Sequence, residues 1–304
     1  MKILDFLKQN KIDFKQDVML KDLTNFKIGG KCKVVVFPNT KSKLIKLLTF
    51  LKNNKLLFYV LGAGTNVLAS DRGYKGILIK LSELKEVKVK NNIIIAQAGV
   101  NLFDLNKVAL RNGLTGLEFS FGIPGSVGGA CYMNAGAFNH NISEKLECVE
   151  VFDGEKVFVL NHKDLCFGYR DSVFSKKKLV IISAKFVLEN GDKERIKQEQ
   201  KRILNRRLFY QPYDLPSAGS VFKRLDGGEK PVSALIDQVG LKGKTIGGAQ
   251  VSKKHAVFIV NIDNASCKDV KHLIKYIRKV IKKAYNLKIE QEIVEIGVKN
   301  GIIW

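Results

Sequence analysis

Residues 121–138 read FGIPGSVGGACYMNAGAF, and this segment constrains the fold more than any other part of the chain. It carries no charged side chain, and it combines Pro124 with five glycines: Gly122, Gly125, Gly128, Gly129 and Gly136. Because glycine is entropically costly to order, this density indicates close backbone approach or positive φ angles. We expect a partly buried loop whose N–H groups face an anion such as a pyrophosphate. A tight turn between two core elements is an equal alternative.

A second glycine loop lies upstream. Residues 56–61 (LLFYVL) predict a buried strand, and residues 62–66 (GAGTN) follow it directly. This is not a Rossmann fingerprint, because Val67 takes the sixth position and no long helix fits before the apolar run at 77–81. The loop therefore connects strand to strand. Two such loops predict a dinucleotide held between two subdomains.

Composition limits the class of protein. The 304 residues are 45% hydrophobic, enough for two or three domains with cores. No stretch approaches the roughly 20 apolar residues of a membrane span, and the charged N-terminus predicts no signal peptide. The odd, scattered cysteines lack a CxxC pair, which is typical of reduced thiols in a cytoplasm: Cys32, Cys131, Cys148, Cys166 and Cys267. The four histidines show no metal-ligand spacing, so we expect no metal site. The absence of a long apolar stretch leads us to expect no membrane partner.

The net charge of +23 raises the alternative of a nucleic-acid-binding protein. The lysines, however, are spread along every expected helix, mostly on polar faces where solvated charge is the default. No arginine-rich tract or nucleic-acid motif accompanies them. We therefore expect no nucleic-acid partner, and a positive field that steers polyanionic small molecules.

The remaining pattern predicts an α+β enzyme. Asp153-Gly154 marks a hairpin, and Ser266 with Asp269 forms a capping box. The expected helices are 41–53, 101–113, 192–207, 232–239 and 266–285, and the expected strands are 92–96, 148–152, 156–160, 178–188, 256–261 and 288–296. A turn-rich segment at 211–216 suggests a domain boundary nearby.

Several motifs, in order and nearly end to end, resemble the UDP-N-acetylenolpyruvoylglucosamine reductase family. They are NFKIGG (25–30), LGAGTN (61–66), GIPGSVGGACYMNAGAF (122–138), FGYRDSVF (167–174), PSAGSVFK (216–223), GLKGKTIGGAQVSKKHAVFIVN (240–261) and IEQEIVEIG (289–297). The short path from Arg170 through Asp192 to Ser220 resembles the shorter type, which lacks an extra loop carrying a tyrosine. Each motif is weak alone, and together they are specific.

The resemblance implies a two-subdomain FAD-binding unit of the vanillyl-alcohol-oxidase (PCMH) type plus a C-terminal α+β substrate domain. We place these parts at residues 1–70, 71–207 and 208–296, with a tail at 297–304. FAD binding is expected from two groups of loop residues: Gly62, Ala63, Gly64, Thr65 and Asn66, and Ile123, Pro124, Gly125, Ser126 and Gly129. No histidine lies in the first loop and Cys131 looks buried, so we expect non-covalent FAD.

The implied reaction reduces UDP-N-acetylglucosamine enolpyruvate to UDP-N-acetylmuramate with NADPH, for peptidoglycan. A hydride from reduced FAD goes to C3, and negative charge develops as an enolate. Arg170 suits the cation beside the enolate. Glu292, if protonated by burial, suits a hydrogen-bond donor, and Ser220 suits the acid that protonates C2. These are the positions onto which the family's catalytic residues fall.

Each candidate also has a structural interpretation. Arg170 could pair with Asp171 at the surface, Ser220 could be a turn residue, and Glu292 could face solvent on a strand. Glu290 is the nearest rival of Glu292, and we choose Glu292 because the resemblance places the second glutamate of the ExE pair at the flavin.

The expected substrate contacts are Tyr169, Lys223, Arg224 and His255. A structural role for His255 is at least as plausible. The family usually has Asn-Pro where this chain has Arg224-Leu225. Arg224 could instead bind a phosphate of the substrate, or the loop could sit differently.

Another flavin oxidoreductase of the same fold remains an alternative function, since it would keep the FAD loops without needing Ser220 and Glu292 together. We expect a cytoplasmic monomer.

Overall fold

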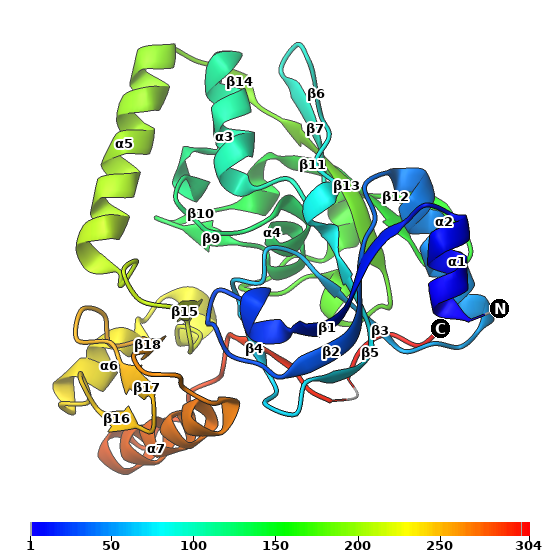
Figure 1. Ribbon diagram of the computed structural model, residues 1–304. Helices are drawn as coiled ribbons and strands as arrows, with labels where there is room; N and C mark the ends of the chain where they lie inside the picture. Colours follow the sequence, from blue (N-terminus) through cyan, green and yellow to red (C-terminus); the bar gives the residue numbers. More distant parts are fainter. Residues whose placement is uncertain (1, 299) are drawn as a thin grey trace.

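The N-terminal part of the computed structural model is a four-stranded sheet (Figure 1). The model describes residues 2–298 and 300–304. The strand order is β1-β2-β5-β3, and the bounds are β1 Asp13–Met19, β2 Lys31–Phe37, β5 Tyr74–Lys80 and β3 Phe58–Leu61. Helix α1 (Ile3–Gln9) precedes this sheet, and α2 (Lys41–Asn53) buries four leucines at helical spacing. Thr40 caps α2 by accepting a hydrogen bond from the Lys43 amide.

The middle part is an antiparallel sheet with helices at one end and one face. Its strand order is β12-β11-β13-β7-β6, with bounds β12 Val157–Asn161, β11 Leu146–Phe152, β13 Val180–Val187, β7 Ile93–Gln97 and β6 Val87–Lys90. Helix α4 (Val127–Met133) packs against β13 and β7, and α3 (Leu102–Arg111) lies beside the long α5 (Lys193–Tyr210). Short pairs, β9 (Gly136–Ala137) with β10 (His140–Asn141) and β8 (Leu114–Thr115) with β14 (Glu189–Asn190), complete this part.

Helix α5 leads into the C-terminal part, which lies at the lower left in Figure 1. Its sheet has the order β15-β18-β17-β16, with bounds β15 Ser217–Ser220, β18 Phe258–Asn261, β17 Ala249–Val251 and β16 Thr245–Ile246. Helices α6 (Val232–Gln238) and α7 (Cys267–Tyr285) pack with this sheet around a separate apolar core. The capping box of Ser266 and Asp269 at the start of α7 is confirmed.

After α7 the chain returns to the N-terminal part. Strand β19 (Val294–Ile296) pairs in parallel with β4 (Val67–Ala69), which follows the first glycine loop. Ile302 then forms an isolated bridge with Phe58 of β3. The two termini consequently lie close together in Figure 1.

Most elements expected from the sequence are present, and two expectations need correction. The five expected helices and the Asp153-Gly154 hairpin are confirmed. The segment expected as a loop around residues 122–138 contains helix α4, and the strand expected at 288–296 is regular only at Val294–Ile296. Domain boundaries after residues 70 and 207 remain our proposal; strand β5, which follows the first of them, is hydrogen-bonded between β2 and β3.

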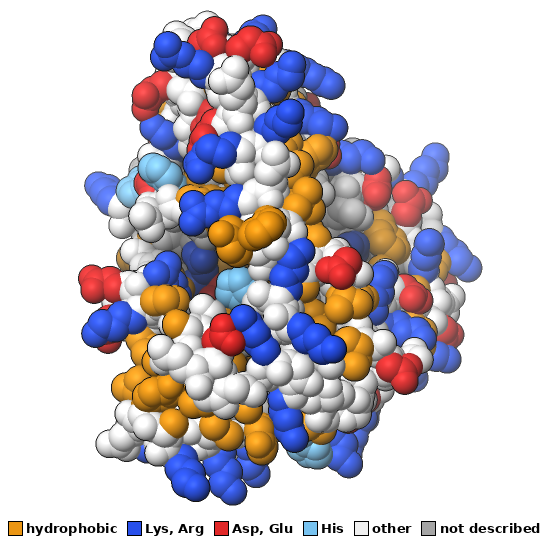
Figure 2. Space-filling model, turned by 90° about the vertical axis from the view of Figure 1, so that its left-hand side faces the viewer, with side chains coloured by type: hydrophobic (Ala, Val, Ile, Leu, Met, Phe, Trp, Pro, Cys, Tyr) orange, Lys and Arg blue, Asp and Glu red, His pale blue; other side chains and the backbone are white. Residues whose placement is uncertain are grey.

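The surface carries its charges dispersed. Figure 2 shows lysine and arginine side chains scattered over the face around α5, with apolar patches between them. None of the described helices is long and apolar enough to span a membrane. Among the described residues, no cluster of three or more His, Cys, Asp or Glu side chains is arranged to hold a metal ion.

Asp71, which follows β4, fastens the C-terminal part to the N-terminal part. Its carboxylate accepts hydrogen bonds from the first two amides of α7, Cys267 N–H at 2.7 Å and Lys268 N–H at 3.1 Å. These amides have no partner within the helix, and the positive end of the helix dipole favours an anion there.

We predict that Asp71→Ala lowers the free energy of unfolding by about 1 kcal/mol, because the first amides of α7 lose their acceptor. Urea denaturation of the variant and the wild type measures the difference. The exposed Asp164→Ala serves as the control, and equal stability of all three proteins would show that the Asp71 contact contributes nothing.

Candidate active site

A cavity of about 820 Å³ lies where the three parts of the chain meet. Its walls include residues 62–66 after β3, residues 123–126 and 129 around the start of α4, and side chains from β15 and the segment before β19. All the expected cofactor-binding and catalytic residues line it, including Arg170, Ser220 and Glu292. Residues far apart in the sequence therefore share one chamber, which is large enough for a cofactor and part of a substrate.

The two glycine loops touch at one wall of this cavity. A Cβ atom on Gly62 would lie 2.4 Å from Ser126 Oγ, too close for any other residue without movement. Gly64 has a φ of +81°, and its Cβ would lie 2.3 Å from the Leu23 carbonyl oxygen. Position 62 thus needs glycine for close approach of the two loops. Position 64 needs glycine for close approach and also for its backbone conformation.

The backbone amides of the two loops differ in availability. Within the described chain, the N–H groups of residues 63–66, 125 and 126 donate to no protein acceptor. The next three amides are already used: Val127 and Gly128 donate to the Val100 and Ala98 carbonyls, and Gly129 donates to Ser126 Oγ. An anion such as a pyrophosphate is therefore better matched by the amides of residues 63–66 than by the start of α4.

Lys80 holds the first glycine loop through a side-chain hydrogen bond, and this residue was not identified from the sequence. Its side chain at the end of β5 is only 8% exposed, and Nζ donates a hydrogen bond to the Gly62 carbonyl. Burial lowers the pKa of the Lys80 ammonium to about 8. The signal available in the sequence was a lone lysine in the apolar run ILIKL.

Arg170 occupies a tight turn in which its backbone has a φ of +53°. The turn is closed by an antiparallel bridge between Gly168 and Asp171. The guanidinium donates from Nε to Glu292 Oε1 at 2.9 Å and from one terminal nitrogen to the Gly136 carbonyl at 2.8 Å. The guanidinium therefore binds Glu292 and the Gly136 carbonyl, and it does not form the surface ion pair with Asp171 that the sequence allowed.

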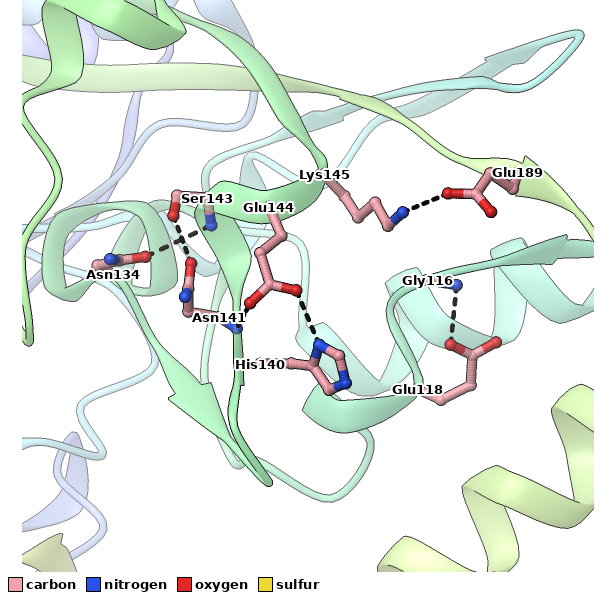
Figure 3. Close-up of polar contacts among 9 residues, drawn as sticks. All are labelled: Gly116, Glu118, Asn134, His140, Asn141, Ser143, Glu144, Lys145 and Glu189. Carbon is pink, nitrogen blue, oxygen red and sulfur yellow. Dashed lines mark hydrogen bonds and ion pairs between the residues drawn. The ribbon is translucent and has the colours of Figure 1, made fainter. Parts of the chain in front are cut away.

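A polar network fixes the backbone beside Arg170. Asn134, the left-handed residue at the end of α4, donates to the Gly168 carbonyl at 2.9 Å. Its Oδ1 accepts from the Ser143 amide, and Figure 3 shows Asn134 with Ser143, Asn141 and the neighbouring Glu144. The glycine-rich segment and the arginine turn are thereby connected.

Glu292 is held from two sides. Its amide donates to the Val221 carbonyl at 2.8 Å, and its own carbonyl accepts from Asn66 Nδ2 at 3.4 Å. The Glu292 side chain is 12% exposed, whereas that of Glu290 is 70% exposed. Burial raises the pKa of the Glu292 carboxyl, although Arg170 and Lys223 act in the opposite direction. Glu292, and not its rival Glu290, lies in the cavity wall.

Ser220 ends β15, where it faces Phe258 of β18. The pairing is irregular between Ser217 and Ser220, and Gly219 between them has a φ of +77° with open space beside it. This irregular strand end places Ser220 in the cavity wall together with Arg170 and Glu292.

The four expected substrate contacts lie outside the cavity wall. Tyr169 and Arg224 are neighbours, since the Arg224 amide donates to the Tyr169 hydroxyl at 3.2 Å, while Lys223 pairs loosely with Glu290. His255 packs edge-on against Phe258, which lines the cavity. Burial lowers the pKa of His255, and its buried Nδ1 has no hydrogen-bond partner in the described part of the chain.

Comparison with known proteins identifies relatives of the whole chain. Residues 211–296 match the family described as UDP-N-acetylenolpyruvoylglucosamine reductase, C-terminal domain, and residues 32–156 match the FAD binding domain. A UDP-N-acetylenolpyruvoylglucosamine reductase of Caldanaerobacter subterraneus subsp. tengcongensis is 42% identical over 299 residues, 98% of each chain. One from Clostridium botulinum (strain Eklund 17B / Type B) is 42% identical over 93% of this chain and 92% of its own.

Solved structures agree with these relatives. The reductase of the same name from Thermus caldophilus superposes with a TM-score of 0.79 at 32% identity, covering 93% of this chain and 98% of that one. The Physcomitrella patens BBE-like 1 enzyme, as its D396N variant, has a TM-score of 0.50 at 15% identity and covers 62% of this chain and 45% of its own, which shows the fold alone. The predicted FAD-binding unit with a C-terminal α+β domain is confirmed.

We predict that Glu292→Gln changes stability in a pH-dependent way. A carboxyl whose folded pKa is raised contributes stability that is complete below its ordinary value of 4.5 and is lost as pH rises through the folded pKa. The glutamine of Glu292→Gln does not ionise, so the variant does not lose this stability as pH rises. The melting temperature of the apoprotein variant, relative to wild type, should therefore rise between pH 4.5 and pH 8.

The exposed Glu290→Gln is the matched control for this measurement. A melting-temperature difference for Glu292→Gln that falls with increasing pH, or that Glu290→Gln reproduces, would contradict the assignment of a buried, destabilised carboxylate.

Proposed function

Since the chain belongs to the UDP-N-acetylenolpyruvoylglucosamine reductase family, it is an FAD-containing oxidoreductase of peptidoglycan precursor synthesis, and we propose that Arg170, Ser220 and Glu292 carry its chemistry. It reduces UDP-N-acetylglucosamine enolpyruvate in a flavin-dependent reaction. The observation that carries the proposal is the convergence of these three side chains on the one cavity that both glycine loops line.

The cavity fits FAD on the evidence of its own walls. At Gly62 and Gly64 a Cβ would collide with Ser126 Oγ or the Leu23 carbonyl oxygen, so the loop packs closely on its neighbours, and the free amides of residues 63–66 suit the pyrophosphate. Ile123, Pro124, Gly125, Ser126 and Gly129 form the facing wall. When bound and reduced, FAD supplies a hydride to C3 of the enolpyruvyl group, and NADPH is the expected reductant.

Arg170 stabilises the negative charge that develops on the substrate carboxylate and enolate. Its guanidinium is permanently charged and planar, so it can pair with a carboxylate through two parallel hydrogen bonds. The contacts to Glu292 and the Gly136 carbonyl hold it in place before substrate arrives. Such pre-organised charge lowers the barrier without reorganisation at the moment of reaction.

Glu292 acts in its protonated form. Burial favours the neutral carboxyl, which can donate a hydrogen bond to the enolate oxygen where a carboxylate could only repel it. Since Arg170 binds one carboxyl oxygen, the other remains for the substrate.

Ser220 donates the proton that completes the reduction at C2. A serine hydroxyl is a weak acid, so this transfer requires a strongly basic carbon and close alignment. The irregular end of β15 supports that alignment by turning Ser220 toward the shared cavity.

Beyond the three catalytic residues, we propose that Tyr169, Lys223, Arg224 and His255, which lie outside the cavity wall, contact the UDP-bearing part of the substrate. The positive charges there suit the diphosphate. We also propose a cytoplasmic monomer that binds small molecules and neither nucleic acid nor membrane, consistent with the dispersed charge in Figure 2.

We predict that Ser220→Ala separates the two half-reactions. Reduction of the flavin by NADPH should be nearly unchanged, whereas reoxidation by UDP-N-acetylglucosamine enolpyruvate should slow at least about 100-fold, the usual contribution of a general acid. Anaerobic stopped-flow absorbance of the flavin measures both rates, with the exposed Ser42→Ala as control.

Two results would overturn this proposal. Rapid reoxidation in Ser220→Ala would remove the serine from the proton transfer. A wild-type flavoprotein that NADPH reduces but the enolpyruvyl substrate does not reoxidise would indicate another flavin oxidoreductase of the same fold.

We predict that Arg170→Lys slows reoxidation by the enolpyruvyl substrate about 10- to 100-fold, because lysine keeps the charge but loses the planar fork. The same stopped-flow experiment gives the rate, and the FAD content of the variant should match wild type. Equal slowing of the NADPH step would instead indicate general damage to the site.

A further inference from the structure

A further group of residues lines the cavity on elements other than those that carry Arg170, Ser220 and Glu292. They are Tyr59 and Val60 of β3, residues 176–181 leading into β13, and residues 300–302. The loop 62–66 continues directly from β3, so it connects this group to the rest of the cavity. Residues 300–302 lie outside the two segments that match known families.

The covalent order of FAD determines which part reaches these residues. The pyrophosphate separates the isoalloxazine from the adenosine, and the free amides suited to it belong to residues 63–66. The reacting ring must lie beside Arg170, Ser220 and Glu292. With the ring there, the adenosine of a bound FAD would extend from the loop toward another part of the cavity, where β3 and residues 300–302 form the wall.

The segment 300–304 is held firmly at this place. Ile302 exchanges two backbone hydrogen bonds with Phe58, at 2.7 and 3.0 Å. Gly301 has a φ of +156°, and a Cβ there would lie 2.3 Å from the Phe58 carbonyl oxygen, so the segment lies directly on β3. The lining here combines apolar side chains such as Val60, Val180 and Ile302, which suit a flat aromatic base, with the lysines at 176–178.

Trp304 is the anchor of the segment. Its ring packs against Phe58 at 5.1 Å and Phe152 at 5.5 Å between centroids, and Nε1 donates to the Lys178 carbonyl at 3.0 Å. Lys178 Nζ donates in return to the Ile303 carbonyl at 2.8 Å. The anchor thus connects the N-terminal sheet, the hairpin of the middle sheet and the start of β13.

We propose that residues 300–304 form part of the FAD site as a strap that closes the cavity over the adenosine, with Ile302 in contact with the cofactor and Trp304 holding the strap in position. The inference rests on FAD occupying the cavity. The strap adds affinity for the adenosine half of the cofactor and leaves the catalytic end unchanged.

The test compares the affinities of apoprotein variants for FAD and for FMN, which has the same ring and one phosphate but no adenosine. Flavin fluorescence quenching gives both dissociation constants. In Trp304→Ala the dissociation constant for FAD should rise at least about tenfold. In Ile302→Ala it should rise at least about threefold. The constant for FMN should stay within about twofold of wild type in both variants.

Tyr276→Ala, a partly exposed aromatic residue on α7, is the matched control and should change neither constant. Unchanged FAD affinity in both strap variants would overturn the proposal. Equal weakening of FAD and FMN would also overturn it, because it would show general damage to the fold; the melting temperature of each apoprotein reports such damage separately. A wild-type protein that binds no flavin would instead overturn the proposed function itself.

Discussion

The hydrogen bond from Arg170 Nε to Glu292 Oε1 is the interaction on which the site depends. Arg170 belongs to the middle part of the chain, and Glu292 lies on the segment that returns from the C-terminal part. Glu292 is also tied to Val221, next to Ser220, and to Asn66 in the first glycine loop. Losing this hydrogen bond would leave a partly buried guanidinium without one of its acceptors, so the contact favours the arrangement in which all three parts meet.

The same constraint explains the chemistry that the cavity can support. A guanidinium that is always charged lies beside a carboxyl whose pKa burial raises, so the site combines a fixed positive charge with a potential proton donor. The glycine loops of the same cavity expose free amides, and Lys80 holds the first loop by donating a hydrogen bond to the Gly62 carbonyl. One wall of the cavity is thus suited to anion binding and the other to charge that develops during reaction.

Local patterns predicted the parts of this structure that depend on local physics. The caps of Thr40 and Ser266 and the Asp153-Gly154 hairpin all follow from nearby residues. The insertion of β5 between β2 and β3 and the breakdown of the expected strand at residues 288–293 depend on distant partners. The pairing of Arg170 with Glu292 joins residues 122 positions apart, so without the family resemblance Asp171 was the more natural partner.

A double-mutant cycle on Arg170 and Glu292 tests the central claim most directly. The measured quantity is the rate at which UDP-N-acetylglucosamine enolpyruvate reoxidises the reduced flavin in wild type, Arg170→Met, Glu292→Gln and the double variant. If the two side chains act as one unit, the double variant is about as slow as the slower single variant, with a coupling energy above about 1 kcal/mol. Rate losses that simply multiply would show that the two residues act independently, and would contradict the account.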